Sequence, residues 1–236
     1  MNDPLLHFDG VRFAWPGTRR DTLDVADLRV ARSERVLVRG HSGCGKSTLL
    51  SLAAGVLLAN SGSVRFMGQD WSSLRTGARD QRRVDHVGYI FQQFNLLPYL
   101  SVIDNVLMPC RFSPLRARRA ADGGSIEQAA QVLLERLGLP RDTWGRNASA
   151  LSVGQQQRVA AARALIGHPE IVIADEPTSA LDEERRDAFM DLLLARCEEA
   201  SSALVFVSHD ARLARHFGRV IELPAVNRAA AAESEA

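Results

Sequence analysis

The sequence predicts an α/β fold with a parallel sheet that helices cover on both faces. Two apolar runs, at 171–175 and 203–207, lack the alternation of polar residues that a half-exposed strand would show, which is typical of strands buried on both faces. Helical patterns at 47–58 and 183–199 alternate with such strands along the chain. A glycine-rich turn joins the strand expected at 35–39 to the first of these helices. Strand, turn and helix in this order are typical of a parallel α/β sheet.

The elements follow from local patterns in chain order. Before residue 92, loose alternation of apolar and polar residues, or short apolar runs, predict strands. One segment with apolar residues at helical spacing precedes a turn at 59–62. We expect strands at 5–15, 23–31, 35–39, 63–67 and 86–91, and a helix at 47–58.

The middle of the chain changes to helical periodicity, which predicts a mainly helical insertion over about 93–160. Apolar residues at helical spacing predict helices at 102–108, 126–137 and 154–166, and the segment 112–125, rich in Arg, Ala, Pro and Gly, is expected to be a loop. The last part returns to strands and a helix up to residue 226. Residues 1–226 are therefore expected to form one domain, followed by a frayed tail at 227–236.

Composition excludes several classes of protein. The 236 residues are 46% hydrophobic and 24% charged, which is ordinary globular composition and excludes a disordered or collagen-like chain. Because 29 basic residues nearly balance 28 acidic ones, no broad basic face for nucleic acid is expected. The three cysteines, Cys44, Cys110 and Cys197, are too far apart for a zinc motif or a disulfide framework. The chain shows neither a signal peptide nor an apolar run of spanning length, so a cytoplasmic location is expected.

The glycine-rich turn fits the phosphate-binding pattern GxxxxGK[ST] completely. Glycines let several backbone N–H groups converge on phosphate oxygens, and the following helix points its positive end at them. Lys46 is the only lysine of the chain, and a compact ammonium fits between the β- and γ-phosphates where a planar guanidinium would not. The Ser47 hydroxyl is placed to bind Mg²⁺. The residues expected to hold nucleotide here are Gly40, His41, Ser42, Gly43, Cys44, Gly45, Lys46, Ser47 and Thr48.

Two adjacent carboxylates, Asp175 and Glu176, end the apolar strand at 171–175. Phosphoryl transfer to water needs one group to hold the metal and another to orient or deprotonate the water. Asp175, at the strand end, suits the metal role together with Ser47, and Glu176 suits the role of base.

Four segments in this order resemble the ATP-binding-cassette (ABC) ATPases: 40–48 (GHSGCGKST), 151–158 (LSVGQQQR), 175–182 (DEPTSALD) and 208–210 (SHD). The resemblance covers essentially the whole chain. It implies a P-loop NTPase core of ABC type with an N-terminal antiparallel β subdomain and an inserted α-helical subdomain. It also implies ATP and Mg²⁺ as cofactors.

The resemblance assigns roles to four further residues. Trp15 resembles the adenine-stacking aromatic, with a core tryptophan as the alternative. Gln92 resembles the glutamine that reaches Mg²⁺ and the attacking water, with Gln93 as its competitor. His209 resembles the catalytic histidine that contacts the γ-phosphate. Asp182 resembles the aspartate that crosses the dimer interface.

The segment 151–158 resembles the family signature that faces the γ-phosphate held by another subunit. A serine at a helix N-cap followed by backbone N–H groups makes an anion site, so Ser152, Gly154 and Gln155 are expected to contact nucleotide. A simple capped helix is the alternative. Val153 departs from the common glycine of the family, and either a negative φ or a slightly different packing of this loop would accommodate it.

One phosphate loop and one signature per chain imply that two copies, or this chain and a paralogous subunit, share two composite ATP sites. Because no segment of the chain spans a membrane, a separate permease is expected to hold the ATPase at the inner face of the membrane. The segment 91–109 resembles the branch of lipoprotein-releasing and macrolide-export ATPases, whose permeases have a large periplasmic domain.

Three alternatives remain open. Ser179–Ala180 after Asp-Glu-Pro-Thr is also common in ATPases of amino-acid importers. A basic groove or a long coiled-coil insertion would favour a soluble ABC ATPase of iron–sulfur assembly or DNA repair, and the sequence shows neither. A non-hydrolysing regulatory module would lack the intact set Lys46, Asp175, Glu176 and His209.

Overall fold

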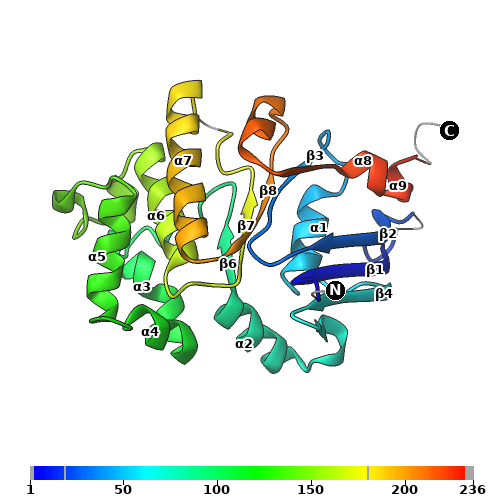
Figure 1. Cartoon of the computed structure of the whole chain (residues 1–236), viewed down its shortest axis with the longest axis horizontal. Coiled ribbons are helices and arrows are strands. Elements are labelled where there is room, and N and C mark those ends of the chain that lie inside the picture. Colours follow the sequence, from blue (N-terminus) through cyan, green and yellow to red (C-terminus); the bar gives the residue numbers. More distant parts are fainter. Residues whose placement is uncertain (1–2, 19, 180, 232–236) are drawn as a thin grey trace. The chain divides into compact units, whose positions relative to one another are not determined.

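The computed structural model describes residues 3–18, 20–179 and 181–231 (Figure 1). Two compact units make up the chain. The first contains residues 1–83 and 205–236, and the second contains residues 84–204. Each unit contains strands and helices, in agreement with the predicted α/β class.

The first unit contains a four-stranded antiparallel sheet in the order β2-β1-β4-β5 (Figure 1). The central strand β1 (Leu6–Phe13) pairs with β2 (Leu23–Val30) on one side and β4 (Ser61–Phe66) on the other, and β5 (Gln69–Asp70) forms the edge. Buried and exposed residues alternate along β1 and β2, which is the pattern of a sheet with one face in the core. This sheet confirms the antiparallel N-terminal part that the family resemblance implied.

A parallel pair in the same unit leads to the phosphate loop. Strand β3 (Arg35–Arg39) pairs in parallel with β9 (Arg219–Glu222), and the loop joins β3 to α1 (Lys46–Ala53). The helix predicted at 47–58 is shorter than expected. It ends near Gly55, which has φ +66°, and a Cβ there would lie 2.6 Å from the Trp71 ring.

The sequence analysis missed several short or polar elements. Helix α2 (Thr76–His86) contains no buried residue, so it shows no apolar stripe from which it could have been predicted. The others are brief, namely η1 (Trp71–Ser73), η4 (Ala211–His216), β9 and the helices α8 (Leu223–Val226) and α9 (Arg228–Ala231).

The tail expected to fray from residue 227 is instead ordered at its start. Asn227 is buried and forms a β-bridge with Val25, and 228–231 are helical. Residues 232–236 lie outside the described part of the chain.

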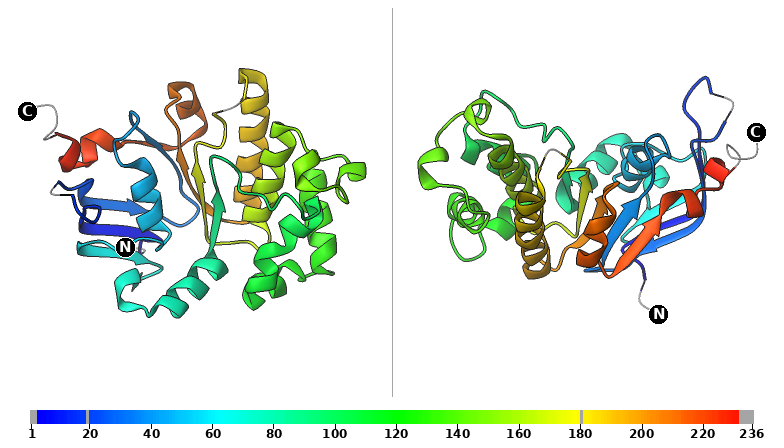
Figure 2. Two further views of the ribbon diagram at one scale, coloured as in Figure 1. Left: turned by 180° about the vertical axis from the view of Figure 1, so that it is seen from behind. Right: turned by 90° about the horizontal axis from the view of Figure 1, so that it is seen from above.

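The second unit contains a parallel pair of strands, β6 (Val87–Ile90) and β7 (Ile171–Asp175), with helices beside it (Figure 2). Its main helices are α3 (Val102–Phe112), α5 (Ile126–Arg136), α6 (Val153–Leu165) and α7 (Glu183–Glu199), with short turns η2 (Arg141–Thr143) and η3 (Ala148–Ala150). Strand β8 (Ala203–Val207) carries the chain from this unit back to the first. Helix α6 approaches β6 closely, because a Cβ at Gly88 would lie 2.3 Å from the carbonyl oxygen of Ala164.

The segment 112–125 contains a helix where the sequence analysis expected a loop. Helix α4 (Pro114–Ala120) starts at Ser113, whose hydroxyl accepts a hydrogen bond from the N–H of Arg116, with proline at the first helical position. The Arg116 side chain is only 2% exposed and donates to the carbonyl oxygens of Ile166 and Ala164, at the C-terminal end of α6. In a sequence, a buried arginine bound to helix carbonyls cannot be told from an arginine on the surface, which explains the error.

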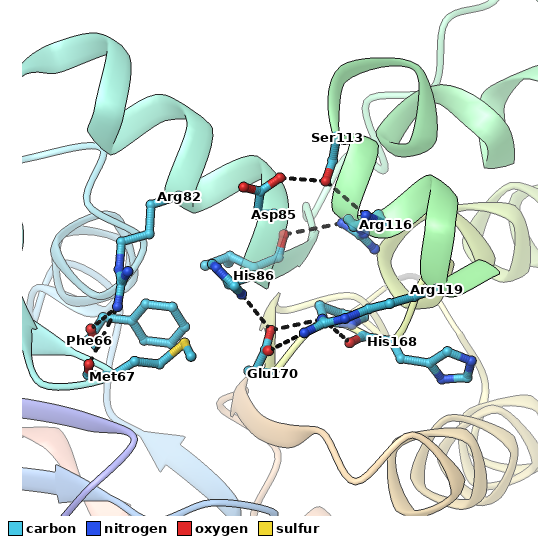
Figure 3. A network of polar contacts seen from close by, with 12 residues as sticks. Phe66, Met67, Arg82, Asp85, His86, Ser113, Arg116, Arg119, His168 and Glu170 are labelled. Atoms are coloured by element: carbon cyan, nitrogen blue, oxygen red, sulfur yellow. Dashed lines mark hydrogen bonds and ion pairs between the residues drawn. The ribbon is translucent and has the colours of Figure 1, made fainter. Parts of the chain in front are cut away.

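A second polar contact of this region joins α4 to the residue before β7. Glu170 accepts two hydrogen bonds from Arg119, one of 2.7 Å at Oε1 and one of 3.3 Å at Oε2 (Figure 3). His86 Nδ1 lies 2.8 Å from the same Oε2. Burial acts to raise the pKa of Glu170, but the hydrogen bonds with His86 and Arg119 outweigh it and hold the pKa at about 2.

This depressed pKa predicts an acid-sensitive contribution to stability. A carboxyl group with a lower pKa in the folded than in the unfolded chain stabilises the fold above its unfolded pKa and loses that effect as the pH falls through its folded pKa. The unfolding free energy should therefore decrease as the pH falls from about 4.5, the ordinary pKa of the carboxyl group, to about 2, its pKa in the folded chain. Glu170→Gln should cost about 2 kcal/mol at pH 7 and flatten this decrease, as measured by urea unfolding at several pH values. An unchanged pH dependence would contradict the assignment.

None of the helices within the described ranges is long and apolar enough to cross a lipid bilayer. The three cysteines are buried free thiols. The described residues contain no group of three or more His, Cys, Asp or Glu side chains that could hold a metal ion by themselves.

Candidate nucleotide-binding site

The phosphate loop turns sharply at two glycines in the first unit. Gly43 and Gly45 have φ angles of +82° and +97°, which L side chains rarely adopt. A Cβ at Gly45 would also lie 2.8 Å from Leu23 Cδ2 and 3.1 Å from the carbonyl oxygen of Thr22. Glycine is therefore required at 45 both by its conformation and by the close approach of the loop to the start of β2.

The N-terminus of α1 differs from those of the helices in the second unit. Helices α3 to α7 begin at Ser or Asp side chains that accept a hydrogen bond from the first turn. Helix α1 begins at Gly45 without a side-chain cap and has no acidic residue in its first turn. No side chain caps its first N–H groups, which is the arrangement that binds phosphate at helix N-termini.

Lys46 lies at the same place, mostly buried. Its ammonium donates hydrogen bonds of 2.9 Å to the carbonyl oxygens of Gly40 and His41, the first residues of the loop. The loop carbonyls therefore hold this charge at the mouth of the loop. Ser47 is exposed beside it, whereas Cys44 and Thr48 are buried, so Cys44 and Thr48 support the loop more than they face solvent.

These features fit the phosphates of a nucleotide with Mg²⁺. The glycines give the loop its left-handed turns, the helix end offers N–H donors, and the lysine offers a positive charge. The Ser47 hydroxyl is a hard oxygen ligand of the kind that Mg²⁺ accepts beside phosphate oxygens and water.

Two further predicted residues belong to the first unit. Trp15 lies in the turn after β1, is 46% exposed and packs edge-on against Phe13, with 5.2 Å between the ring centroids. The core tryptophan of this unit is instead Trp71, which is 1% exposed. The alternative of a core residue is therefore wrong for Trp15. His209 is exposed just after β8, next to Ser208, whose hydroxyl accepts from the N–H of Asp210.

The second unit brings Gln92, Asp175 and Glu176 to one edge of its parallel strands. Ile90 on β6 is paired with Ala174 on β7, so Gln92 and Glu176 each lie two residues beyond that pair. Gln92 is exposed, and so is its competitor Gln93, so exposure alone does not separate the two. Burial, together with the Asp175 carboxylate, raises the pKa of Tyr89 on β6 above its ordinary value.

Glu176 has a left-handed backbone, with φ +43°. This conformation is uncommon for a residue with a side chain and ends β7 abruptly at the carboxylates. The turn is held from two sides. The N–H of Ser179 donates to the Glu176 carbonyl at 3.2 Å, and the buried Gln157 side chain donates to the carbonyl of Pro177 at 3.0 Å.

The chain after Gln92 is also fixed to α6. Phe94 and Asn95 both have left-handed backbones, and their carbonyl oxygens accept hydrogen bonds from the Arg163 guanidinium. Gln157 and Arg163 thus tie one helix to both turns at this edge. The sequence analysis did not identify either residue, because a Gln and an Arg in a helical period carry no signal of what their side chains bind.

The signature segment forms the N-terminus of α6. Ser152 and Gln155 cap each other: the Ser152 hydroxyl accepts from the N–H of Gln155, and the Gln155 side chain accepts from the N–H of Ser152. Val153 is the first residue of the helix and has no positive φ. A negative φ, rather than a different packing of the loop, therefore accommodates valine here. A Cβ at Gly154 would meet nothing within 4 Å, so the glycine leaves this helix end open.

Asp182 caps α7. Its carboxylate accepts a hydrogen bond of 2.9 Å from the N–H of Arg185, and the residue is exposed. Ala180, two residues before Asp182, lies outside the described residues.

Comparison with known proteins identifies the family. The profile described as ABC transporter matches residues 23–179. The chain belongs to the ABC transporter family. Its fold is that of an ATP-binding cassette, and it is an ABC ATPase, as the sequence predicted.

Curated relatives include proteins of transport systems. The lipoprotein-releasing system ATP-binding protein LolD of Legionella pneumophila is 36% identical over 225 residues, which cover 94% of this chain and 96% of LolD. The macrolide export ATP-binding/permease protein MacB 1 of Aeromonas hydrophila is 40% identical over 225 residues. This ABC ATPase spans about a third of MacB 1 (34%) and of the probable syringafactin export protein SyfD of Pseudomonas syringae (33%).

Solved structures show the same fold. The dimeric structure of MJ0796, described as a bacterial ABC transporter cassette, has a TM-score of 0.81 and 32% identity, with 92% of this chain and 93% of that chain covered. A dimer of MJ0796 bound to ADP and Pi has a TM-score of 0.77 and 31% identity over the same shares of the two chains.

Proposed function

We propose that this ABC ATPase binds ATP with Mg²⁺ at its phosphate loop, dimerises on it, and uses its hydrolysis to drive a separate membrane permease. The phosphate loop carries the proposal: an uncapped helix N-terminus, left-handed glycines and the only lysine of the chain meet in one turn. Apolar packing does not explain a buried ammonium held on loop carbonyls beside a helix N-terminus, whereas phosphate binding does.

In this proposal each of these residues has its own task. Lys46 and the N–H groups of the loop bind the phosphates, and Trp15 stacks on adenine. Mg²⁺, when bound, would neutralise phosphate charge, and Ser47, Asp175 and Gln92 are the residues that would hold it. Glu176 orients the attacking water and accepts its proton, and His209 supports the γ-phosphate.

A second copy of the chain is proposed to complete each site. Ser152, Gly154 and Gln155 would face the γ-phosphate bound by the partner, and Asp182 would lie at the interface. The surroundings of Gly154 support this role, because a Cβ there would meet nothing within 4 Å and the space beside this turn of α6 is open. The dimers of the related cassette MJ0796, one of them with ADP and Pi, support it as well.

We propose further that the permease partner belongs to an export or lipoprotein-releasing system with a large periplasmic domain, which would hold the ATPase at the inner face of the membrane. The names of the LolD and MacB relatives support this branch. An ATPase of a polar amino-acid importer is the second candidate, favoured by Ser179 after Asp-Glu-Pro-Thr. A neighbouring reading frame for a four-helix permease with a large periplasmic domain would favour the first, and one for a solute-binding protein would favour the second.

Lys46→Ala tests the phosphate loop. We expect the affinity for ATP to fall by about 10- to 100-fold, since the loss of a charged contact to phosphate costs about 1.5–3 kcal/mol. Calorimetric titration with Mg²⁺ and ATP measures the change. Arg118→Ala, on the exposed side of α4, removes a positive charge elsewhere and should leave the affinity unchanged. Equal affinity of the Lys46 variant and the wild type would refute the proposed site.

A further inference from the structure

The buried side chain of Asn227 connects the end of the chain to the phosphate loop. It is 1% exposed and makes four hydrogen bonds within the first unit. Its Oδ1 accepts from the N–H of Asp24 at 2.8 Å and of Ala229 at 3.2 Å. Its Nδ2 donates to the carbonyl oxygens of Thr22 at 3.0 Å and Cys44 at 3.3 Å. The amide thus uses both donors and both acceptor positions.

Two of these partners lie where the phosphate loop rests on β2. Cys44 is inside the loop, and Thr22 immediately precedes β2. The same place shows the close approach of Gly45 to Leu23 and to the Thr22 carbonyl. Asn227 therefore bonds both sides of one contact, the backbone of the loop and the backbone that supports it.

The residues before Asn227 touch the start of the loop. We call residues 223–229 the C-terminal strap. A Cβ at Gly40 would lie 3.1 Å from Pro224 Cδ and 2.5 Å from Cys44 Sγ, so the strap packs directly against the first residue of the loop. Leu223 is fully buried, and helix α9 contacts β2. In Figure 2 the red C-terminal helices lie beside the blue segments of β2 and the phosphate loop.

The bond to Cys44 also sets the direction of an N–H group. A trans peptide unit is planar, so its C=O and its N–H point in opposite directions. With the Cys44 carbonyl bound to Asn227, the N–H of Gly45 points away from the strap. Gly45 is the residue from which α1 begins, so this N–H belongs to the set that the uncapped helix end offers to phosphate.

We infer that Asn227 is a positioning residue for nucleotide binding, which holds the Cys44–Gly45 peptide of the phosphate loop from behind. This inference rests on the proposed role of the loop. Without the amide, the Thr22 and Cys44 carbonyls lose their donor, and the peptide is free to rotate away from the phosphate-binding orientation.

The test compares nucleotide affinity with stability. Asn227→Ala in the full chain should weaken ADP binding, measured by calorimetry with Mg²⁺ well below the melting temperature, by about tenfold. Asn227→Asp should weaken it at least as much, because it keeps the acceptor for Asp24 but sets a carboxylate oxygen against two carbonyls. The matched control is Asn105→Ala. Asn105 is an equally buried asparagine in the second unit that also makes four hydrogen bonds, to Leu97, Leu100 and Ser101.

We expect the melting temperatures of the Asn105 and Asn227 variants to fall by similar amounts. Only the Asn227 variants should bind ADP more weakly. ADP affinity of Asn227→Ala within twofold of the wild type, with Lys46→Ala weakened, would overturn the inference. If Lys46→Ala also bound normally, the proposed function itself would fail.

A second measurement needs no variant. Because coupling between two sites is reciprocal, ADP should slow hydrogen exchange in the wild-type peptide that covers the strap. Unchanged exchange in the strap at saturating ADP would count against the inference even if Asn227→Ala could not be folded.

Discussion

Glu176→Gln should reduce ATP hydrolysis by about 10²- to 10⁴-fold and leave ATP binding intact. Glutamine has nearly the shape of glutamate but cannot accept the proton of the attacking water, and a positioned base contributes a factor of this size. We expect the substitution to leave the local backbone, with φ +43° at residue 176, unchanged. Hydrogen bonds to the carbonyl oxygens of Glu176 and Pro177 hold this turn. Phosphate release at saturating ATP measures the effect.

The same variant should accumulate as a dimer in ATP, because the γ-phosphate that joins the two copies is no longer removed. Size-exclusion chromatography with and without ATP would show this shift. Glu184→Gln is the matched control, since it makes the same chemical change at an exposed position in the first turn of α7. Hydrolysis by Glu176→Gln at a rate close to that of the wild type would mean that another group is the base.

Local patterns were sufficient where one residue type has one physical use. The loop 40–48 could be predicted because Gly43 and Gly45 need positive φ and its lysine does not serve apolar packing. The buried strands β7 and β8 could be predicted because continuous apolar runs have few other uses in a chain of this composition. The sharp turn at Glu176 could not, since nothing in its residue type requires a left-handed backbone.

Polar residues that act inside the fold could not be predicted from local patterns. Arg116, Arg163 and Asn227 are each bound to backbone carbonyls of segments far away in the sequence, 48 to 205 residues for the bonds described. A helical period or a polar tail looks the same whether its side chains face water or a distant carbonyl. Helix α4 and the residues from 227 onwards were therefore expected to be a loop and a frayed end.

These buried polar contacts lie next to the predicted motifs. Arg163 and Gln157 hold the turns that follow β6 and β7, and Asn227 holds the phosphate loop. Motif residues are recognisable because their chemistry restricts them to few residue types. The residues that position them are recognisable only in the folded chain, because many side chains could make a hydrogen bond to a backbone oxygen.

A mixture of two inactive variants should recover ATP hydrolysis if each site is built from two chains. Lys46→Ala removes the phosphate-binding lysine. Ser152→Asp keeps a good N-cap for α6 but places a negative charge where the partner's γ-phosphate is expected. Each variant alone spoils both sites of its dimer, so each should be at least about tenfold less active than the wild type.

In a mixed dimer both defects fall on one site, because that site takes Lys46 from one chain and Ser152 from the other. The second site then has an intact lysine and an intact serine. Random pairing makes about half of the dimers mixed, so about a quarter of all sites should be intact. Phosphate release from an equimolar mixture, against each variant at the same total concentration, measures the recovery. If each chain formed its own complete site, mixing would restore nothing, because every chain in the mixture carries a defect.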